Sequence, residues 1–139
     1  MRIFLKGVGA FAIVLVSFFG TLFLLEYFAP LCPKGAAVDL TAPFARMGTG
    51  YAYSVTVPAL ADRADSSAAP TQSGFLVCEN GYRLGPPHSV HADIAAKGKG
   101  RFSHWTSGFI FSASDNSDPN TNGRRYWARA GHQIGTARR

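Results

Sequence analysis

The stretch from Arg101 to Trp127, RFSHWTSGFIFSASDNSDPNTNGRRYW, carries the densest strand and turn signals of the chain. A polar and aromatic cluster at 102–105 leads into the alternating run Phe109-Ile110-Phe111, which is typical of a half-buried strand. A long polar loop follows and ends in Asn122-Gly123, a dipeptide that favours a turn. The chain then returns through Arg-Arg-Tyr-Trp at 124–127. This pattern predicts a β-hairpin with an elaborated tip.

Further strand signals lie upstream of this stretch. Residues 51–57 alternate and are rich in aromatic and β-branched side chains, and residues 75–78 form a short apolar run. Asn80-Gly81 predicts a tight type I′ hairpin turn, because that turn needs positive φ at both central residues. Residues 88–94 fit either one helical turn or an irregular loop. The sequence therefore predicts a mainly β fold, a small antiparallel domain of about four or five strands.

The expected core consists of the large apolar side chains of these segments. They are Phe75, Val77, Leu84, Ile94, Phe102, Trp105, Phe109, Phe111, Tyr126 and Trp127.

The N-terminal region has a different character from the rest of the chain. Residues 7–25 are 19 positions without a charge, and a helix of that length covers about 28 Å, enough to cross a bilayer. Arg2 and Lys6 precede it, which favours a cytoplasmic N-terminus. We therefore expect a transmembrane signal-anchor at 1–29 in a bacterial inner membrane, with the β domain on the extracytoplasmic side. A cleaved signal peptide and a buried core helix are the alternatives.

The remaining segments complete the predicted organisation. Residues 30–50 contain Pro, Gly and Ala without periodicity and are expected to form a stalk, 51–130 the β domain, and 131–139 a basic tail. An extracytoplasmic location permits a disulfide between Cys32 and Cys78. The predicted strand position of Cys78 fits a small buried hydrophobic residue equally, so both interpretations stay open.

Asp118, Asn120 and Asn122 match the first half of a calcium-binding loop, with oxygen ligands at alternate positions before a glycine. The second half fails, because Arg129 stands where such a loop needs a glutamate. Short polar side chains that bond to the backbone of a turn explain the same pattern. Ca²⁺ is thus a possible ligand, and no other cofactor is expected.

His88, His91, Asp93 and His104 form the one cluster with metal-binding or acid/base potential. Ordinary hydrogen-bonded histidines of a polar loop are the simpler interpretation. The sequence has no nucleophile elbow, no phosphate-binding glycine loop and no evident carboxylate pair. These features disfavour an enzyme, and no catalytic residue is assigned.

Positive charge gathers in the C-terminal part of the chain. From Lys97 onward there are eight Lys or Arg residues against two acids, interleaved with aromatic residues. Arginine binds carboxylate and phosphate, and aromatic rings stack on sugars. A basic face that keeps the domain soluble, with the aromatic residues in the core, explains the same composition. The predicted location argues against nucleic acid as the ligand. The candidate ligand-binding residues are Arg101, His104, Trp105, Asp115, Asn116, Arg124, Arg125 and Tyr126.

Several motifs resemble a short bacterial cell-envelope module. They are ENGxxLGPPHxxHADI at 79–94, GRFSHW at 100–105 and SDNSDPxTNGR at 114–124. The module is associated with membrane-anchored or multidomain envelope proteins, some linked to surface polysaccharide. The resemblance covers about 51–130 and implies a self-standing domain in the envelope, without assigning a catalytic residue.

Composition, predicted location and resemblance together indicate a membrane-anchored domain that binds an envelope polysaccharide or another anionic polymer. Two alternatives remain. One is a non-catalytic subunit that contacts another envelope protein, and the other is an enzyme that uses the histidine cluster.

Overall fold

The computed structural model describes residues 31–131, and within this range it confirms a mainly β, antiparallel domain. One sheet has the order β1-β8-β4-β5 and is called the β4–β8 sheet. Its strands are β1 (Val38–Leu40), β4 (Phe75–Glu79), β5 (Tyr82–Arg83) and β8 (Tyr126–Ala130). The other has the order β2-β3-β7-β6 and is called the β3–β7 sheet. Its strands are β2 (Ala45–Arg46), β3 (Tyr53–Thr56), β6 (Phe102–Trp105) and β7 (Gly108–Phe111).

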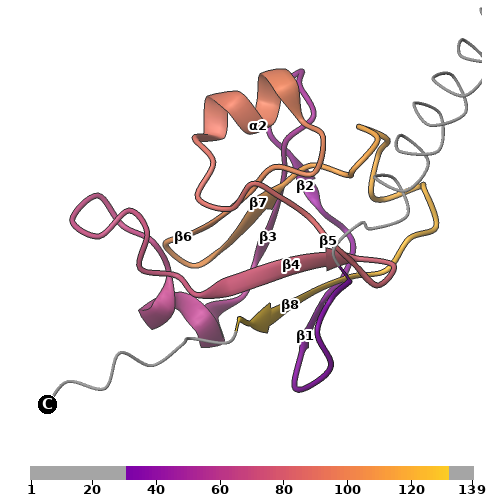
Figure 1. The fold of residues 1–139 in the computed structure, drawn as a ribbon. Coiled ribbons are helices and arrows are strands. Elements are labelled where there is room, and N and C mark those ends of the chain that lie inside the picture. Colours follow the sequence, from indigo (N-terminus) through magenta and orange to yellow (C-terminus); the bar gives the residue numbers. More distant parts are fainter. Residues whose placement is uncertain (1–30, 132–139) are drawn as a thin grey trace, which may run out of the picture. The chain divides into compact units, whose positions relative to one another are not determined.

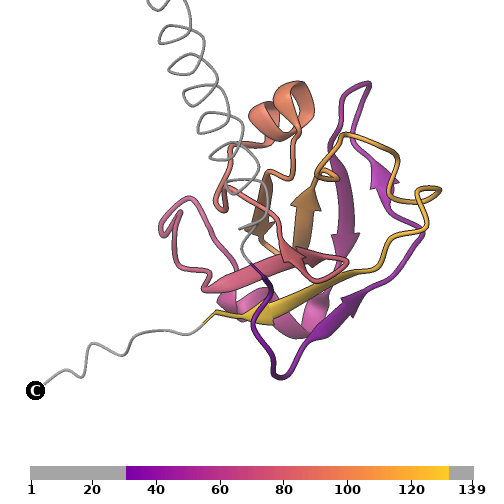
Figure 2. The ribbon, with the colours of Figure 1, turned by 45° about the vertical axis from the view of Figure 1, so that its right-hand side comes forward.

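Two short helices complete the described elements, the 3-10 helix η1 (Pro58–Arg63) and α2 (His91–Lys97). α2 begins in the segment 88–94, where the sequence left one helical turn open. Figures 1 and 2 show α2 beside β6 and β7.

The hydrophobic core lies between the two sheets. Phe75 of β4 packs edge-on against Phe109 of β7, with ring centroids 6.1 Å apart, and Tyr126 of β8 lies 5.1 Å from Phe111. Alternation along each strand sends every second side chain into this layer. Eight of the predicted core residues are buried as expected, whereas Trp105 and Trp127 are half-buried.

The Asn80-Gly81 turn joins β4 to β5 as predicted. Asn80 has φ 47° and Gly81 has φ 98°, the positive values that this hairpin turn requires. The Asn80 side chain also ties the turn to the start of β8, because its Oδ1 accepts the Arg125 N–H at 2.9 Å.

The predicted hairpin across 101–127 is wrong in its pairing. β6 and β7 pair through a tight connection at Thr106-Ser107, and β8 pairs instead with β1 and β4 of the opposite sheet. Residues 112–125, called the crossing loop below, therefore run from one sheet to the other. The alternating pattern marks a strand but not its partner, and the shorter connection forms the local hairpin.

The predicted stalk is also corrected, because part of 30–50 belongs to the folded domain. β1 pairs with β8 and β2 pairs with β3. Between them, Phe44 enters the core and packs edge-on against Phe111, with centroids 5.1 Å apart. The two strands have three and two residues, too few to display a period in the sequence.

Cys32 and Cys78 form a disulfide, so the bonded alternative holds and Cys78 is in addition fully buried. The bond fixes the segment before β1 to β4. Nearby, the Cys32 N–H donates to the Gly81 carbonyl at 2.7 Å, and Arg129 Nη2 donates to the Lys34 carbonyl at 2.6 Å.

No helix within residues 31–131 is long and apolar enough to cross a membrane. The predicted anchor at 1–29 lies outside the described residues, as does the predicted basic tail beyond Gly131.

Candidate functional site

The predicted ligand-binding residues separate into two regions. One region is where the crossing loop leads into β8, and it contains Arg124, Arg125 and Tyr126, with Asp115 of the same loop paired to Arg124. The other region is β6, which contains His104 and Trp105. Arg101 directly precedes β6, and its Nη1 donates to the Gly98 carbonyl at 3.0 Å.

Arg124 is already bound by two carboxylates of its own chain. Its guanidinium contacts Asp115 Oδ2 at 2.6 Å and Glu79 Oε1 at 3.1 Å. The hydrogen bonds to Asp115 and then to Glu79 raise the pKa of Arg124, and the Arg124 bond holds the pKa of Asp115 well below its usual range. A ligand anion would have to displace one of these partners, so Arg124 is a structural cation.

Tyr126 is not available for stacking, because only 2% of it is exposed. Its hydroxyl donates to Glu79 Oε1 at 2.8 Å and accepts from Asn122 Nδ2 at 2.8 Å. Burial, together with the bond to Glu79, raises the pKa of the Tyr126 hydroxyl. Tyr126 is therefore a core residue, and its hydroxyl belongs to the hydrogen-bond network around Glu79 at the edge of the core.

A hollow of about 260 Å³ adjoins this network and is lined in part by Arg124, Arg125 and Asn120. Arg125 is exposed and lies 3.4 Å from Asp39, which also lines the hollow. Each arginine here thus faces a carboxylate. The local charge offers an anionic polymer little net attraction.

The side-chain oxygens of the candidate calcium loop accept backbone N–H groups. Asp118 Oδ1 accepts from Asn120 N at 2.8 Å, and Asn120 Oδ1 accepts from Phe44 N at 2.7 Å. Asn122 Oδ1 accepts from Arg124 N at 3.0 Å. This is the bonding of a polar turn, and a calcium ion would have to compete with it. Calcium binding stays a prediction.

Asn116 has a similar structural role at the end of α2. Its Oδ1 accepts the Lys99 N–H at 2.5 Å, and its Nδ2 donates to the Lys97 carbonyl at 3.4 Å. Gly98, at φ 58°, passes so close to the Asn116 amide that a side chain there would collide with it. Asn116 thus fixes the loop that follows the helix.

His104 is buried between the sheets and separated from the other histidines. Its ring stacks on Phe109 with centroids 4.3 Å apart, and its Nδ1 lies 2.7 Å from Ser73 Oγ. Burial lowers the pKa of His104; Asp65 raises it less strongly, and Arg63 lowers it further. Asp93 instead pairs with Lys97 on the exposed face of α2 at 3.0 Å. The cluster predicted from the sequence does not converge, and residues 31–131 contain no group of three metal-ligating side chains.

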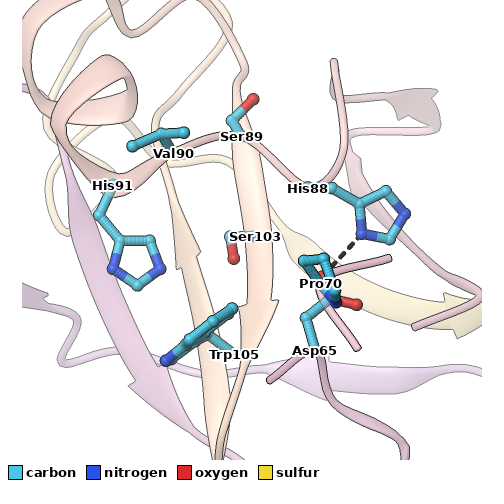
Figure 3. A pocket seen from close by; sticks show the side chains of 8 residues that line it. All are labelled: Asp65, Pro70, His88, Ser89, Val90, His91, Ser103 and Trp105. Atoms are coloured by element: carbon cyan, nitrogen blue, oxygen red, sulfur yellow. Dashed lines mark hydrogen bonds and ion pairs between the residues drawn. The ribbon is translucent and has the colours of Figure 1, made fainter. Parts of the chain in front are cut away.

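His88, His91 and Trp105 instead line an open pocket of about 300 Å³, called the Trp105 pocket below. Its lining residues are Asp65, Pro70, His88, Ser89, Val90, His91, Ser103 and Trp105. Figure 3 shows the Trp105 ring along one wall, with His91 and the Asp65–His88 pair on opposite sides of the pocket. The His91 ring meets the indole edge-on, with centroids 5.7 Å apart.

The pair of Asp65 and His88 was missed from the sequence. His88 Nδ1 lies 2.6 Å from Asp65 Oδ2, and Asp65 Oδ1 accepts the Ser73 N–H at 2.7 Å. Asp65 is 1% exposed, whereas 26% of the His88 side chain is exposed. His88 also has φ 53°, an uncommon backbone conformation that histidine tolerates better than most residues. The two residues are 23 positions apart in loops, so no periodic signal could link them.

The chemistry of the Trp105 pocket is that of a small polar-aromatic binding site. It combines an indole wall, two imidazoles and a buried carboxylate, and none of its lining residues within the described chain is Lys or Arg. Burial lowers the pKa of His91, which favours a neutral imidazole there at pH 7. The volume lies at the lower end of the range of ligand pockets, about 300–1,000 Å³.

Comparison of the chain with protein-family models, curated proteins and solved structures finds no match in any of the three.

Proposed function

We propose that this domain binds a sugar ring of a bacterial cell-envelope polysaccharide in the Trp105 pocket. The observation that carries the proposal is the half-buried Trp105 indole on the wall of an open pocket beside hydrogen-bonding groups. Sugar rings have apolar faces that stack on aromatic rings and hydroxyls that bond to polar groups at the edge. The Arg124 region is less suited, because its cations already have carboxylate partners.

We further propose that residues 1–29 anchor the domain in the inner membrane, with the β domain outside the cytoplasm. The uncharged run at 7–25 supports the anchor. The Cys32–Cys78 disulfide supports the location, since disulfides persist in oxidising compartments. The protein should stay in the membrane pellet after alkaline carbonate extraction, and protease added to spheroplasts should degrade the β domain. A soluble mature protein that begins after residue 30 would refute the anchor.

A glycan array probed with the full-length chain, in a detergent without a sugar headgroup, tests the binding. Trp105→Ala should weaken binding by about tenfold or more, because it removes the stacking ring together with its buried area. Trp127→Ala is the matched control: this half-buried tryptophan does not line the pocket, and its loss should leave the affinity unchanged in a folded variant.

Arg124→Ala separates sugar recognition from recognition of anions. If Arg124 is a structural cation, the folded variant should keep the glycan affinity of the unaltered chain. A loss that shrinks at high salt would instead favour the anionic-polymer interpretation. If the chain binds no glycan but copurifies stoichiometrically with another envelope protein, it acts as an interaction subunit.

A further inference from the structure

The Trp105 pocket contains a polar group that sequence patterns did not single out, the hydroxyl of Ser103. Ser103 lies on β6 and is only 2% exposed. Figure 3 shows its oxygen pointing into the pocket, between His91 and the Asp65–His88 pair. Its Oγ makes no hydrogen bond to another side chain or backbone group of residues 31–131, and the open pocket leaves it within reach of solvent or a ligand.

The other two buried serines differ from Ser103 in this respect. Ser73 Oγ bonds to His104 Nδ1 at 2.7 Å and accepts the Phe75 N–H at 3.3 Å. Ser112 Oγ accepts the Gly100 N–H at 3.1 Å. The Ser103 hydroxyl borders the open pocket, so solvent is its hydrogen-bond partner when the pocket is empty. A ligand hydroxyl in the pocket would replace that solvent.

The charges around Ser103 indicate which ligand fits. Asp65 is the one carboxylate of the lining, and its oxygens are occupied by His88 and the Ser73 N–H. The lining residues include neither Lys nor Arg to receive a second carboxylate or a phosphate. An acidic sugar would therefore lie beside Asp65 without a Lys or Arg to pair with, whereas a neutral sugar meets no such cost.

Building on the proposed sugar binding, we propose that the Trp105 pocket selects an uncharged pyranose over an acidic sugar and that Ser103 is a sugar-binding residue. Its hydroxyl bonds a ring hydroxyl while the apolar face of the sugar lies on Trp105.

The test uses the full-length chain with Trp127→Phe, which leaves Trp105 as the sole tryptophan, since the chain has two. The emission of Trp105 is titrated with methyl α-D-glucopyranoside, methyl β-D-galactopyranoside, methyl α-D-mannopyranoside and D-glucuronic acid. At least one neutral glycoside should shift the emission, and Ser103→Ala should raise its Kd about 3- to 10-fold, the value of one neutral hydrogen bond. Glucuronic acid should bind about tenfold more weakly or not at all.

A second readout needs no ligand. Ser103→Ala should leave the melting temperature of the sugar-free chain unchanged, because the hydroxyl that it removes bonds to solvent in the open pocket. The matched variant Ser73→Ala should lower it, because the buried His104 Nδ1 loses its hydrogen-bond partner.

Two results would overturn the role of Ser103 while leaving sugar binding intact: an unchanged Kd in Ser103→Ala, and a melting temperature that falls as it does in Ser73→Ala. Glucuronic acid binding as tightly as the neutral glycosides would overturn the selection of an uncharged sugar. Failure of all four sugars to change the Trp105 emission would overturn both the role of Ser103 and the proposed function.

Discussion

Glu79 holds together the polar edge of the core, and its replacement by alanine should show how much that edge contributes to stability. Its Oε1 accepts from the Tyr126 hydroxyl at 2.8 Å, from Arg124 Nη1 at 3.1 Å and from the Ser114 N–H at 3.4 Å. Glu79→Ala removes this shared acceptor.

The cost of Glu79→Ala can be worked out from what each donor keeps. Arg124 retains Asp115, so the loss stays below the 3–5 kcal/mol, roughly, of a buried ion pair broken entirely. The buried Tyr126 hydroxyl still accepts from Asn122 but has no acceptor for its own proton, which costs about 1–3 kcal/mol. With the weaker bond to Ser114, we expect the free energy of unfolding to fall by about 2–4 kcal/mol.

Urea denaturation of the full-length chain, followed by tryptophan fluorescence, measures this loss. The same substitution in a Tyr126→Phe background should cost about 1–2 kcal/mol less, because the orphaned hydroxyl is no longer there. Equal costs in the two backgrounds, or a total loss below about 1 kcal/mol, would refute the view that Glu79 acts mainly as an acceptor for buried donors.

Three further perturbations test other parts of the structure. Burial lowers the pKa of His104 in the folded chain, so the unfolded chain takes up a proton at a higher pH than the folded chain does. The free energy of unfolding should therefore fall as the pH drops below about 6.5, and His104→Leu should flatten this pH dependence more than His91→Gln does. Cys32→Ser should lower the free energy of unfolding by about 4 kcal/mol on a chain-entropy estimate for a separation of 46 residues, and a reductant should destabilise the unaltered chain but not this variant. Calcium should leave the melting temperature unchanged, and a calcium-dependent rise that Asp118→Ala abolishes would establish a metal site at the crossing loop.

The two tryptophans show how far alternation along a strand can predict exposure. Alternation places the neighbours Tyr126 and Trp127 on opposite faces of β8, and Tyr126 is buried while Trp127 is half-buried. Alternation did not tell which of the two would be accessible. It also gave no reason to expect that Trp105, counted with the core, would line a pocket instead.

The candidate site was only partly predictable, because its members come from distant segments. His88, His91 and Trp105 stood out by residue type, and the structure brings them to one pocket. Asp65 and Ser103 carried no signal, since an aspartate in a polar loop and a serine in a strand are common. Their importance arises from their positions in the lining of the Trp105 pocket, which only the fold assigns.

The sequence by itself determined the features that depend on a few neighbouring residues. Asn80-Gly81 sets its hairpin through backbone φ, and the alternation at 109–111 sets a strand with one buried face. Only the tertiary structure decided that β8 joins β4 rather than β7, and that Arg124 is neutralised while Trp105 stays accessible. Local signals report the preferences of a short segment, whereas strand partners and pocket walls are selected by packing among segments far apart in the chain.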